Sequence, residues 1–274
     1  MAGLLDPARW VTGGEVLLHG NTIVASEIDR TAEFRGGAIG FVPQDPFSAL
    51  DPLRRVGPQL SRALQLHRGL SRAVAAERIA RLLEAAGMPN PEEILQKCPH
   101  ELSGGQLQRA VIASSLSCEP TLLIADEPTS ALDVIVQAQV LQTFLKLAGD
   151  VGAAVLLVTH DLGVVAEATS RTAAMYAGRI VEFGTTADVM LRPRHPYVHG
   201  LLDSLPVLRG EQERLRAIPG QPPALPGPLD PCAFVPRCPY ANERCRTEEP
   251  RYAWPAGSGV ACHHPVESPR TAVR

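Results

Sequence analysis

The sequence has little lysine, few aromatic residues and no long apolar runs. Only two of its 26 basic residues are lysines, Lys97 and Lys146, and aromatic residues make up 4% of the 274 residues. No apolar run approaches the roughly 18 residues that a membrane-spanning helix needs, and no basic-then-apolar leader opens the chain. We therefore expect a cytoplasmic protein whose contact with a membrane goes through a partner.

Composition and charge exclude further classes of protein. A content of 45% hydrophobic and 20% charged residues excludes a fibrous, coiled-coil or wholly disordered chain, and the length allows one or two domains with a proper core. The formal net charge of −3 gives no global electrostatic reason to bind nucleic acid, so we expect no nucleic-acid partner.

Short apolar runs alternate with helical patterns through residues 1–189. The patterns predict strands at 16–18, 39–42, 122–125, 154–158, 172–176 and 179–183, and helices at 71–86, 103–117, 134–148 and 161–168. Such alternation predicts an α/β layer fold with a largely parallel sheet, and Ala177-Gly178 predicts a hairpin turn. Residues 54–98 show helix after helix and no strand, which indicates an inserted helical subdomain, with residues 99–189 completing the core.

The composition changes again from residue 190. Fifteen of the 25 prolines lie in residues 190–274, and stretches such as 219–223 cannot form regular helix or central strand. We expect a loop-rich C-terminal extension that needs an additional cross-link to hold its conformation.

The segment Leu102-Ser103-Gly104-Gly105-Gln106-Leu107-Gln108-Arg109 stands directly before a helical run. Ser103 is a good N-cap, and the two glycines allow an anion to approach bare backbone amides at a helix N-terminus. An ordinary Ser-Gly-Gly turn that caps a helix is the structural alternative.

Thirteen residues after Arg109, an apolar strand ends in Asp126 and Glu127. In α/β folds the carboxyl edge of the sheet is where ligands bind. One carboxylate there can hold Mg²⁺, and the next can orient or deprotonate water. Two solvated acids at a strand end are the alternative. Gln44 and His160 follow neighbouring strands, and Ser130-Ala131-Leu132-Asp133 follows the two acids.

In this order and spacing, these segments resemble the nucleotide-binding subunit of an ABC transporter. The resemblance covers the signature motif (102–106), Walker B (122–127), the D-loop (130–133), the switch residue His160 and the Q-loop residue Gln44. It implies a P-loop NTPase-like ABC nucleotide-binding domain over residues 1–189, N-terminally truncated, with a helical subdomain and a Pro/Cys-rich extension at 190–274.

The resemblance also implies roles for single residues. Glu127 is then the catalytic base, Asp126 a Mg²⁺ ligand, His160 the γ-phosphate contact, and Gln44 the link between Mg²⁺ and the membrane subunit. In a head-to-tail dimer, the signature residues bind the ATP that the opposite subunit holds. These residues are Ser103, Gly104, Gly105 and Gln106, and the D-loop residue Asp133 lies beside them.

Further segments resemble the dipeptide and oligopeptide importer branch of the family: 131–140, 160–166 and 195–202. Importers of this branch combine an extracytoplasmic peptide-binding protein, two integral permeases and two ATPase subunits, and the helical subdomain touches the permease. The implied function is ATP hydrolysis at the cytoplasmic face of the membrane to energise peptide uptake. Nickel importers share the branch, so the cargo stays open. A soluble ABC protein of DNA repair or translation is disfavoured by the tail.

The phosphate-cradling loop G-x-x-x-x-G-K-[ST] is absent from the sequence. Lys97 follows Gln96, and Lys146 lies within a helical pattern, so neither fits. We expect the sequence to be truncated at its N-terminus. The alternative is a degenerate subunit that only donates its signature motif to a partner's ATP. Without the central strand that leads into the phosphate-cradling loop, apolar sheet surface is expected to be exposed.

Four cysteines lie in the last 45 residues: Cys232, Cys238, Cys245 and Cys262. Their spacing lacks the paired C-x₂-C of common zinc ribbons. Four thiolates can hold an iron–sulfur cluster or zinc, or remain free thiols. The tail resembles the C-terminal extension of peptide-importer ATPase subunits, some of which carry a [4Fe–4S] cluster. This makes the cluster the first expectation and zinc the second, with His263 or His264 as substitute ligands.

Overall fold

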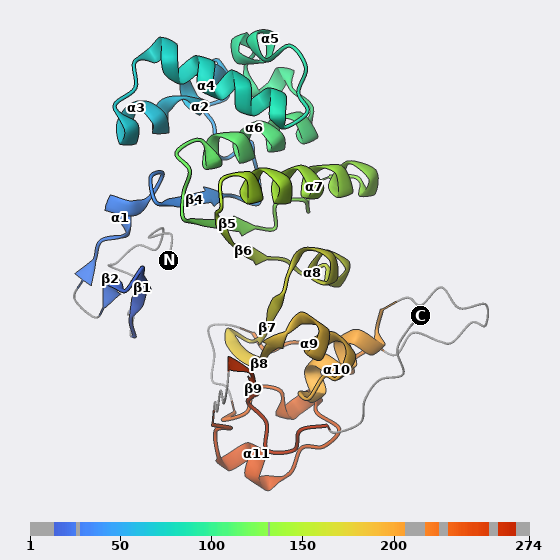
Figure 1. Ribbon diagram of the computed structural model, residues 1–274. Helices are drawn as coiled ribbons and strands as arrows, with labels where there is room; N and C mark the ends of the chain where they lie inside the picture. The colour runs from blue at the N-terminus through green and yellow to red at the C-terminus, as the bar shows by residue number, and fades with distance from the viewer. Residues whose placement is uncertain are drawn as a thin grey trace. The chain divides into compact units, whose positions relative to one another are not determined.

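The computed structural model describes residues 14–25, 28–130, 132–205, 217–224, 230–251 and 257–266. The chain divides into two compact units, residues 1–160 and 161–274, which are described separately (Figure 1). The predicted domain division at 189/190 remains a prediction. Among the described helices, none combines the length and apolar character required to cross a membrane.

The first unit begins with a small antiparallel sheet of β1 (Val16–Leu18), β2 (Asn21–Ala25) and β3 (Ile28–Asp29), followed by the short helix α1 (Thr31–Phe34). Its buried residue Ile23 belongs to one apolar cluster with Ile39 and Ile124. The small sheet is therefore fastened to the main sheet by apolar burial.

The main sheet consists of three parallel strands in the order β4 (Ile39–Val42), β5 (Leu122–Asp126) and β6 (Ala154–Val158). The parallel connections run through α6 (Gly104–Leu116), which leads into β5, and α7 (Val134–Asp150), which leads into β6. A side chain at Gly40 would meet the Ser115 carbonyl at 2.5 Å, so this glycine allows β4 to lie close to the end of α6. The predicted parallel α/β sheet is confirmed.

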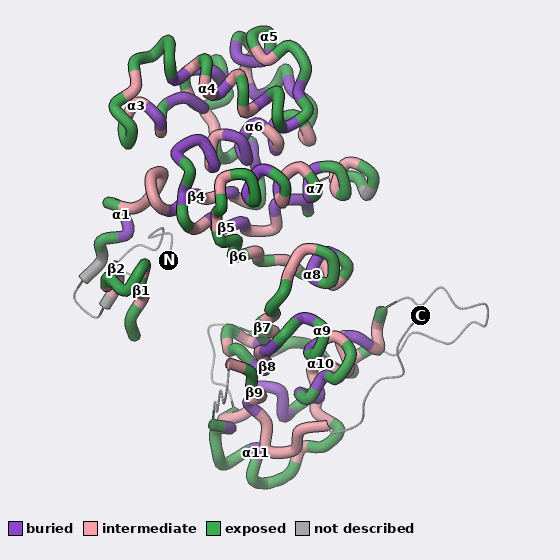
Figure 2. Tube along the Cα trace, in the orientation of Figure 1, coloured by how far each residue is buried: buried purple, intermediate pink, exposed green. Residues whose placement is uncertain are grey.

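The strand β6 is exposed although its sequence is continuously apolar (Figure 2). Val155, Leu156 and Val158 keep 37%, 38% and 47% of their surface accessible, whereas Leu123 and Ala125 of the neighbouring β5 are fully buried. Continuous apolar runs are typical of strands buried on both faces. The apolar sheet surface that the sequence is expected to expose is thus present at β6.

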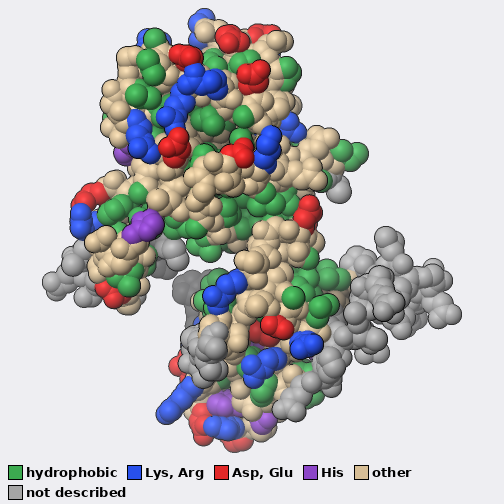
Figure 3. All heavy atoms as spheres, viewed as in Figure 1, with side chains coloured by type: hydrophobic (Ala, Val, Ile, Leu, Met, Phe, Trp, Pro, Cys, Tyr) green, Lys and Arg blue, Asp and Glu red, His purple; other side chains and the backbone are tan. Residues whose placement is uncertain are grey.

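Between β4 and α6 the chain forms four helices: α2 (Val56–Leu60), α3 (Arg62–Arg68), α4 (Arg72–Ala85) and α5 (Pro91–Gln96). A short 3₁₀ helix, η1 (Pro99–Glu101), follows. Buried side chains one helical turn apart on α4, including Ile79 and Leu83, pack with Leu64 and Leu107 into one core. Ser71 caps α4 by accepting a hydrogen bond from the Val74 amide, and basic side chains cross the outer surface over α3 and α4 (Figure 3).

The second unit is built on an antiparallel sheet of β7 (Arg171–Tyr176), β8 (Arg179–Thr185) and β9 (Gly259–Val260). Ala177 and Gly178 both have positive φ, at 48° and 77°, which is the geometry of a two-residue hairpin turn and confirms that prediction. The helical elements of this unit are α8 (Leu162–Ala168), α9 (Thr186–Leu191), α10 (Pro196–Asp203), η2 (Val235–Arg237) and α11 (Glu243–Thr247).

Single polar side chains hold the proline-rich part of this unit. Arg237 donates hydrogen bonds to the carbonyl oxygens of Ile218 and Pro219, at 3.2 and 2.9 Å, and to the Tyr176 hydroxyl. Residues 219–224 form neither helix nor strand, as expected from their prolines. Few backbone hydrogen bonds of helices or strands stabilise this part, so side-chain hydrogen bonds and the apolar cluster around Phe234 hold its conformation.

Candidate functional site

The carboxylate of Glu127 lies between side chains that follow the two neighbouring strands. Its Oε1 is 2.9 Å from His160 Nδ1, and its Oε2 accepts a 2.8 Å hydrogen bond from Gln44 Nε2. Gln44, Glu127 and His160 follow β4, β5 and β6, whose carboxyl ends meet at one edge of the parallel sheet. Folding thus brings together three residues that the sequence singles out.

The backbone of Glu127 has a left-handed conformation, with φ at 44°, which is uncommon for a residue other than glycine. Its amide donates to the Val158 carbonyl at 2.8 Å and extends the pairing of β5 with β6. Its own carbonyl accepts from both the amide and the hydroxyl of Ser130, at 3.2 and 3.1 Å. Neighbouring hydrogen bonds therefore stabilise a conformation that is otherwise costly, as is frequent at functional sites.

The contact with His160 has a defined chemistry. An ionised carboxylate only accepts hydrogen bonds, so the proton of this contact is on Nδ1 and a neutral imidazole keeps Nε2 as an acceptor. The Glu127 side chain is 24% exposed and the His160 side chain 74% exposed, so water can reach the pair. A positioned carboxylate with access to water is suited to general-base chemistry.

Asp126 is the last residue of β5, directly before Glu127 and partly exposed. Carboxylate and amide oxygens are the ligands that Mg²⁺ prefers, and in nucleotide sites one or two carboxylates combine with substrate phosphates. Asp126, Glu127 and the side chain of Gln44 therefore form a donor set that fits a Mg²⁺–nucleotide, although no three described Cys, His, Asp or Glu side chains are arranged to hold a metal ion by themselves.

The predicted signature residues open α6. The Ser103 hydroxyl accepts from the Gln106 amide at 3.3 Å, and the Gln106 side chain accepts from the Ser103 amide at 3.0 Å, so the two form a capping box. The N-cap prediction for Ser103 is confirmed. A side chain at Gly105 would lie 2.6 Å from Val136, so this glycine also serves the close packing of α6 on α7.

The D-loop residues lie beside this helix start. A Cβ on Gly104 would lie 3.5 Å from Leu132, and Asp133 caps α7 by accepting from the Val136 amide at 3.0 Å. The structure thus gathers the predicted residues of the first unit into two groups, one around Glu127 and one at the starts of α6 and α7. Their nucleotide roles remain predictions.

A groove of about 520 Å³ lies between the end of β4 and the helices α2 and α6. It is lined by apolar and small polar side chains, among them Phe41, Pro43, Leu50, Gln59, Val111 and Ser114. Phe47 and Leu53, in the connection that leads from Gln44 to α2, are 47% and 88% exposed. The groove is open and apolar, and the chain from Gln44 runs directly into it.

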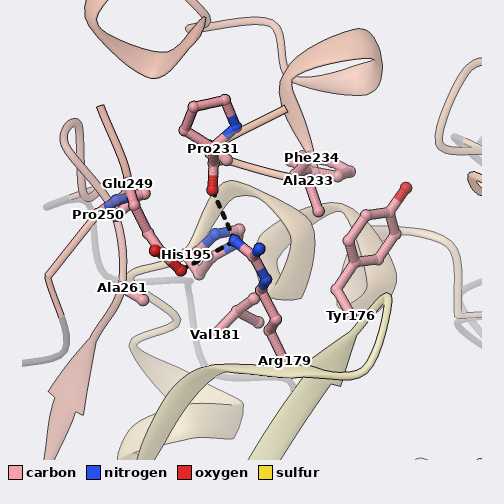
Figure 4. A pocket seen from close by; sticks show the side chains of 11 residues that line it. Tyr176, Arg179, Val181, His195, Pro231, Ala233, Phe234, Glu249, Pro250 and Ala261 are labelled. Carbon is pink, nitrogen blue, oxygen red and sulfur yellow. Dashed lines mark hydrogen bonds and ion pairs between the residues drawn. The ribbon is translucent and has the colours of Figure 1, made fainter. Parts of the chain in front are cut away.

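A narrow hollow of the second unit lies beside His195 (Figure 4). Arg179 reaches across it, donating to the Pro231 carbonyl at 2.7 Å and pairing with Glu249 at 3.0 Å. The charge of Arg179 is therefore neutralised by a partner within the second unit.

Glu182, which no sequence motif marks, is buried beside this hollow. Its carboxylate accepts hydrogen bonds from the backbone amides of Arg194, at 2.9 and 3.1 Å, and of His195, at 2.8 Å. Desolvation by burial raises the pKa of Glu182. No periodicity in the sequence marks this acid as buried, because its partners are main-chain amides of a later segment.

The four tail cysteines lie in the second unit and form no disulfide bonds. Burial, reinforced by repulsion from neighbouring thiolates, raises the pKa values of Cys232, Cys238 and Cys262, the last to about 11. Their side chains thus lie within electrostatic range of one another. Within the described residues, however, they are not arranged to hold a metal ion. Iron or zinc at these thiols, and a substitute role for His263 or His264, remain predictions.

Comparison with known families matches both parts of the chain. Residues 1–130 match the family described as ABC transporter, and residues 181–245 match the family described as oligopeptide/dipeptide transporter, C-terminal region. Among solved structures, a dimeric ATP-binding cassette in a post-hydrolysis state bound to ADP and phosphate is 29% identical, with a TM-score of 0.56 over 64% of this chain and 74% of that one.

Curated relatives extend over most of the chain. A probable peptide ABC transporter ATP-binding protein of Sinorhizobium fredii is 46% identical over 87% of this chain and 71% of its own length. The oligopeptide transport ATP-binding protein OppD of Salmonella typhimurium is 43% identical over 93% of this chain and 76% of its own length. These matches lead to one assignment: the chain belongs to the family of ATP-binding subunits of oligopeptide-importing ABC transporters.

Proposed function

We propose that this chain hydrolyses ATP to energise the uptake of di- and oligopeptides, as a peripheral subunit at the cytoplasmic face of the membrane. The observation that carries the proposal is the convergence of Gln44, Glu127 and His160 at one edge of the parallel sheet. The cargo is supported by the curated relatives, whose names describe peptide and oligopeptide transport.

In this proposal Glu127 takes the proton of the attacking water. Its two oxygens are oriented by the Gln44 amide and by His160 Nδ1, and its backbone is held by Ser130 and Val158. In the same proposal, His160 contacts the γ-phosphate of ATP. Asp126 and Gln44 are the residues that would hold Mg²⁺, and the bound ion would supply positive charge to the phosphates.

The triphosphate also needs a cradle of backbone amides and a lysine. No such loop occurs in these 274 residues, so these residues do not supply that contact.

The partners follow from the same assignment. A second ATPase subunit places its nucleotide against Ser103, Gly104, Gly105 and Gln106, and an integral permease occupies the groove beside Phe41. Because Gln44 leads directly into that groove, closure at Glu127 can be transmitted to the permease. An extracytoplasmic peptide-binding protein delivers the cargo.

The test is ATP turnover by the assembled transporter with Glu127→Gln in this chain. The variant keeps the shape of the side chain and removes the base, so we expect turnover to be abolished. Glu84→Gln, at an exposed position of α4, is the matched control and should leave turnover unchanged. If Glu127→Gln leaves turnover nearly unchanged, the chain is instead a non-catalytic subunit that donates its signature motif to its partner's ATP.

A further inference from the structure

The helical subdomain carries an excess of positive charge that the rest of the chain does not share. Residues 54–81 contain seven arginines and one glutamate, whereas the whole chain has a formal net charge of −3. Figure 3 shows basic side chains crossing the surface over α3 and α4. Concentration of one sign of charge on one surface is an electrostatic footprint of a binding partner with the opposite sign.

Part of this charge is neutralised within the fold. Arg78 pairs with Glu119, Arg81 with Glu77, and Arg54 with Asp51. Other arginines of the segment are not neutralised.

Among the described residues no acid pairs with Arg62 or Arg72, which are both exposed. Arg68, by contrast, donates to the main-chain carbonyl of the buried Cys118. Two full positive charges, one at the start of α3 and one at the start of α4, therefore face solvent without a counter-charge.

An apolar side chain lies beside one of these charges. Leu66 is 61% exposed and stands four residues after Arg62, so the two share the face of α3 opposite the buried Leu64. A single exposed leucine is ordinary. A leucine exposed beside unpaired arginines, however, suits a helix that lies against a membrane interface.

We infer that the exposed Arg62 and Leu66 of α3, together with Arg72 at the start of α4, bind the phosphate headgroups of anionic phospholipids. The inference rests on the proposed location of this subunit at the membrane. Guanidinium groups match phosphate oxygens in two-point hydrogen bonds, while Leu66 enters the headgroup layer. This contact is separate from the groove assigned to the permease, and it adds to the attachment of the subunit.

The test is co-sedimentation of the full chain with vesicles of phosphatidylcholine alone and of phosphatidylcholine mixed with phosphatidylglycerol. Each arginine near an anionic surface contributes a factor of about 5 in affinity, so Arg62→Gln/Arg72→Gln should weaken binding to the anionic vesicles about 25-fold. Leu66→Ser should weaken binding to a smaller extent. Salt should weaken binding of the unaltered chain.

Arg246→Gln/Arg251→Gln, at exposed positions of the second unit, makes the same change in net charge and should bind like the unaltered chain. Equal binding to neutral and anionic vesicles, equal losses in the two double variants, or full binding by Arg62→Gln/Arg72→Gln would each overturn the inference. Binding of the charged surface to reconstituted permease but not to lipid would also overturn it. The measurement involves no ATP turnover, so its outcome is independent of the Glu127 test.

Discussion

Burial of His195 predicts that the second unit loses stability in mild acid. The imidazole is 1% exposed, its Nδ1 accepts a 3.0 Å hydrogen bond from the Tyr197 amide, and it caps α10. Desolvation lowers the pKa of His195 from 6.5 to about 4. Protonation would remove the acceptor that caps the helix and place a charge in an apolar setting beside Phe234.

The sign of the effect follows from proton linkage. The unfolded chain binds a proton at His195 as the pH falls below 6.5, while the folded chain does not until about pH 4. The contribution of this histidine is therefore fully present above pH 6.5 and is lost progressively as the pH falls to 4. The whole loss is about 3 kcal/mol, and about 2 kcal/mol of it occurs between pH 7 and pH 5.

Glu182 works in the opposite direction, because its raised pKa makes the folded state hold a proton more readily than the unfolded state. A comparison with a variant separates the two groups. His195→Asn keeps a side-chain oxygen that can cap α10 and does not titrate. The difference in unfolding free energy between the unaltered chain and His195→Asn should therefore shrink or reverse by about 2 kcal/mol from pH 7 to pH 5.

The assay is urea unfolding of the full chain followed by circular dichroism at both pH values, with NMR titration of the His195 ring as a direct measure of its pKa. His199→Asn, at a partly exposed position of the same helix, is the control. The reasoning is refuted if the His195 ring titrates near 6.5, or if the two chains lose stability in parallel as the pH falls.

Three further predictions concern the packing at glycines, the cap of α6 and the tail cysteines. Gly40→Ala should destabilise the first unit by about 2 kcal/mol or more, because its Cβ would meet the Ser115 carbonyl at 2.5 Å. Gly149→Ala, where nothing lies within 4 Å on helix α7, should stabilise by about 0.5–1 kcal/mol, and the opposite order of the two in urea unfolding would contradict the packing argument. Ser103→Ala should cost about 1 kcal/mol through loss of the α6 cap, whereas Ser103→Thr should retain most of it. Metal analysis decides the cysteine prediction: bound iron with visible absorption, lost in Cys238→Ser, supports the cluster, and protein free of iron and zinc excludes both.

Much of the local structure could be predicted because it is encoded locally. The apolar runs at 39–42 and 154–158 are the observed strands β4 and β6 at the predicted bounds. Ser71 and Ser103 begin helices because a hydroxyl at the N-cap satisfies a free amide three residues later. Helix α10 is not among the predicted helices, although His195-Pro196 marks its start, since proline favours the first helical position.

Features that depend on distant partners could not be predicted in this way. Strand β2 is short, and its Ile23 packs in a cluster that includes Ile124, far along the chain. The burial of Glu182 depends on amides twelve and thirteen residues away. The need for glycine at Gly105 depends on Val136, which reaches it only after α6 and α7 pack.

The sequence by itself determined the kinds of element, their order, and the motifs that mark the family, because periodicity, capping and motif spacing act over a few residues. Only the tertiary structure decided that Gln44 and His160, which lie 83 and 33 residues from Glu127, hold its carboxylate from two sides. It also decided that Glu127 adopts a left-handed backbone and that His195 is buried. The physical reason is that these properties arise from the alignment of parallel strands and from exclusion of water, and both exist only once distant segments have packed.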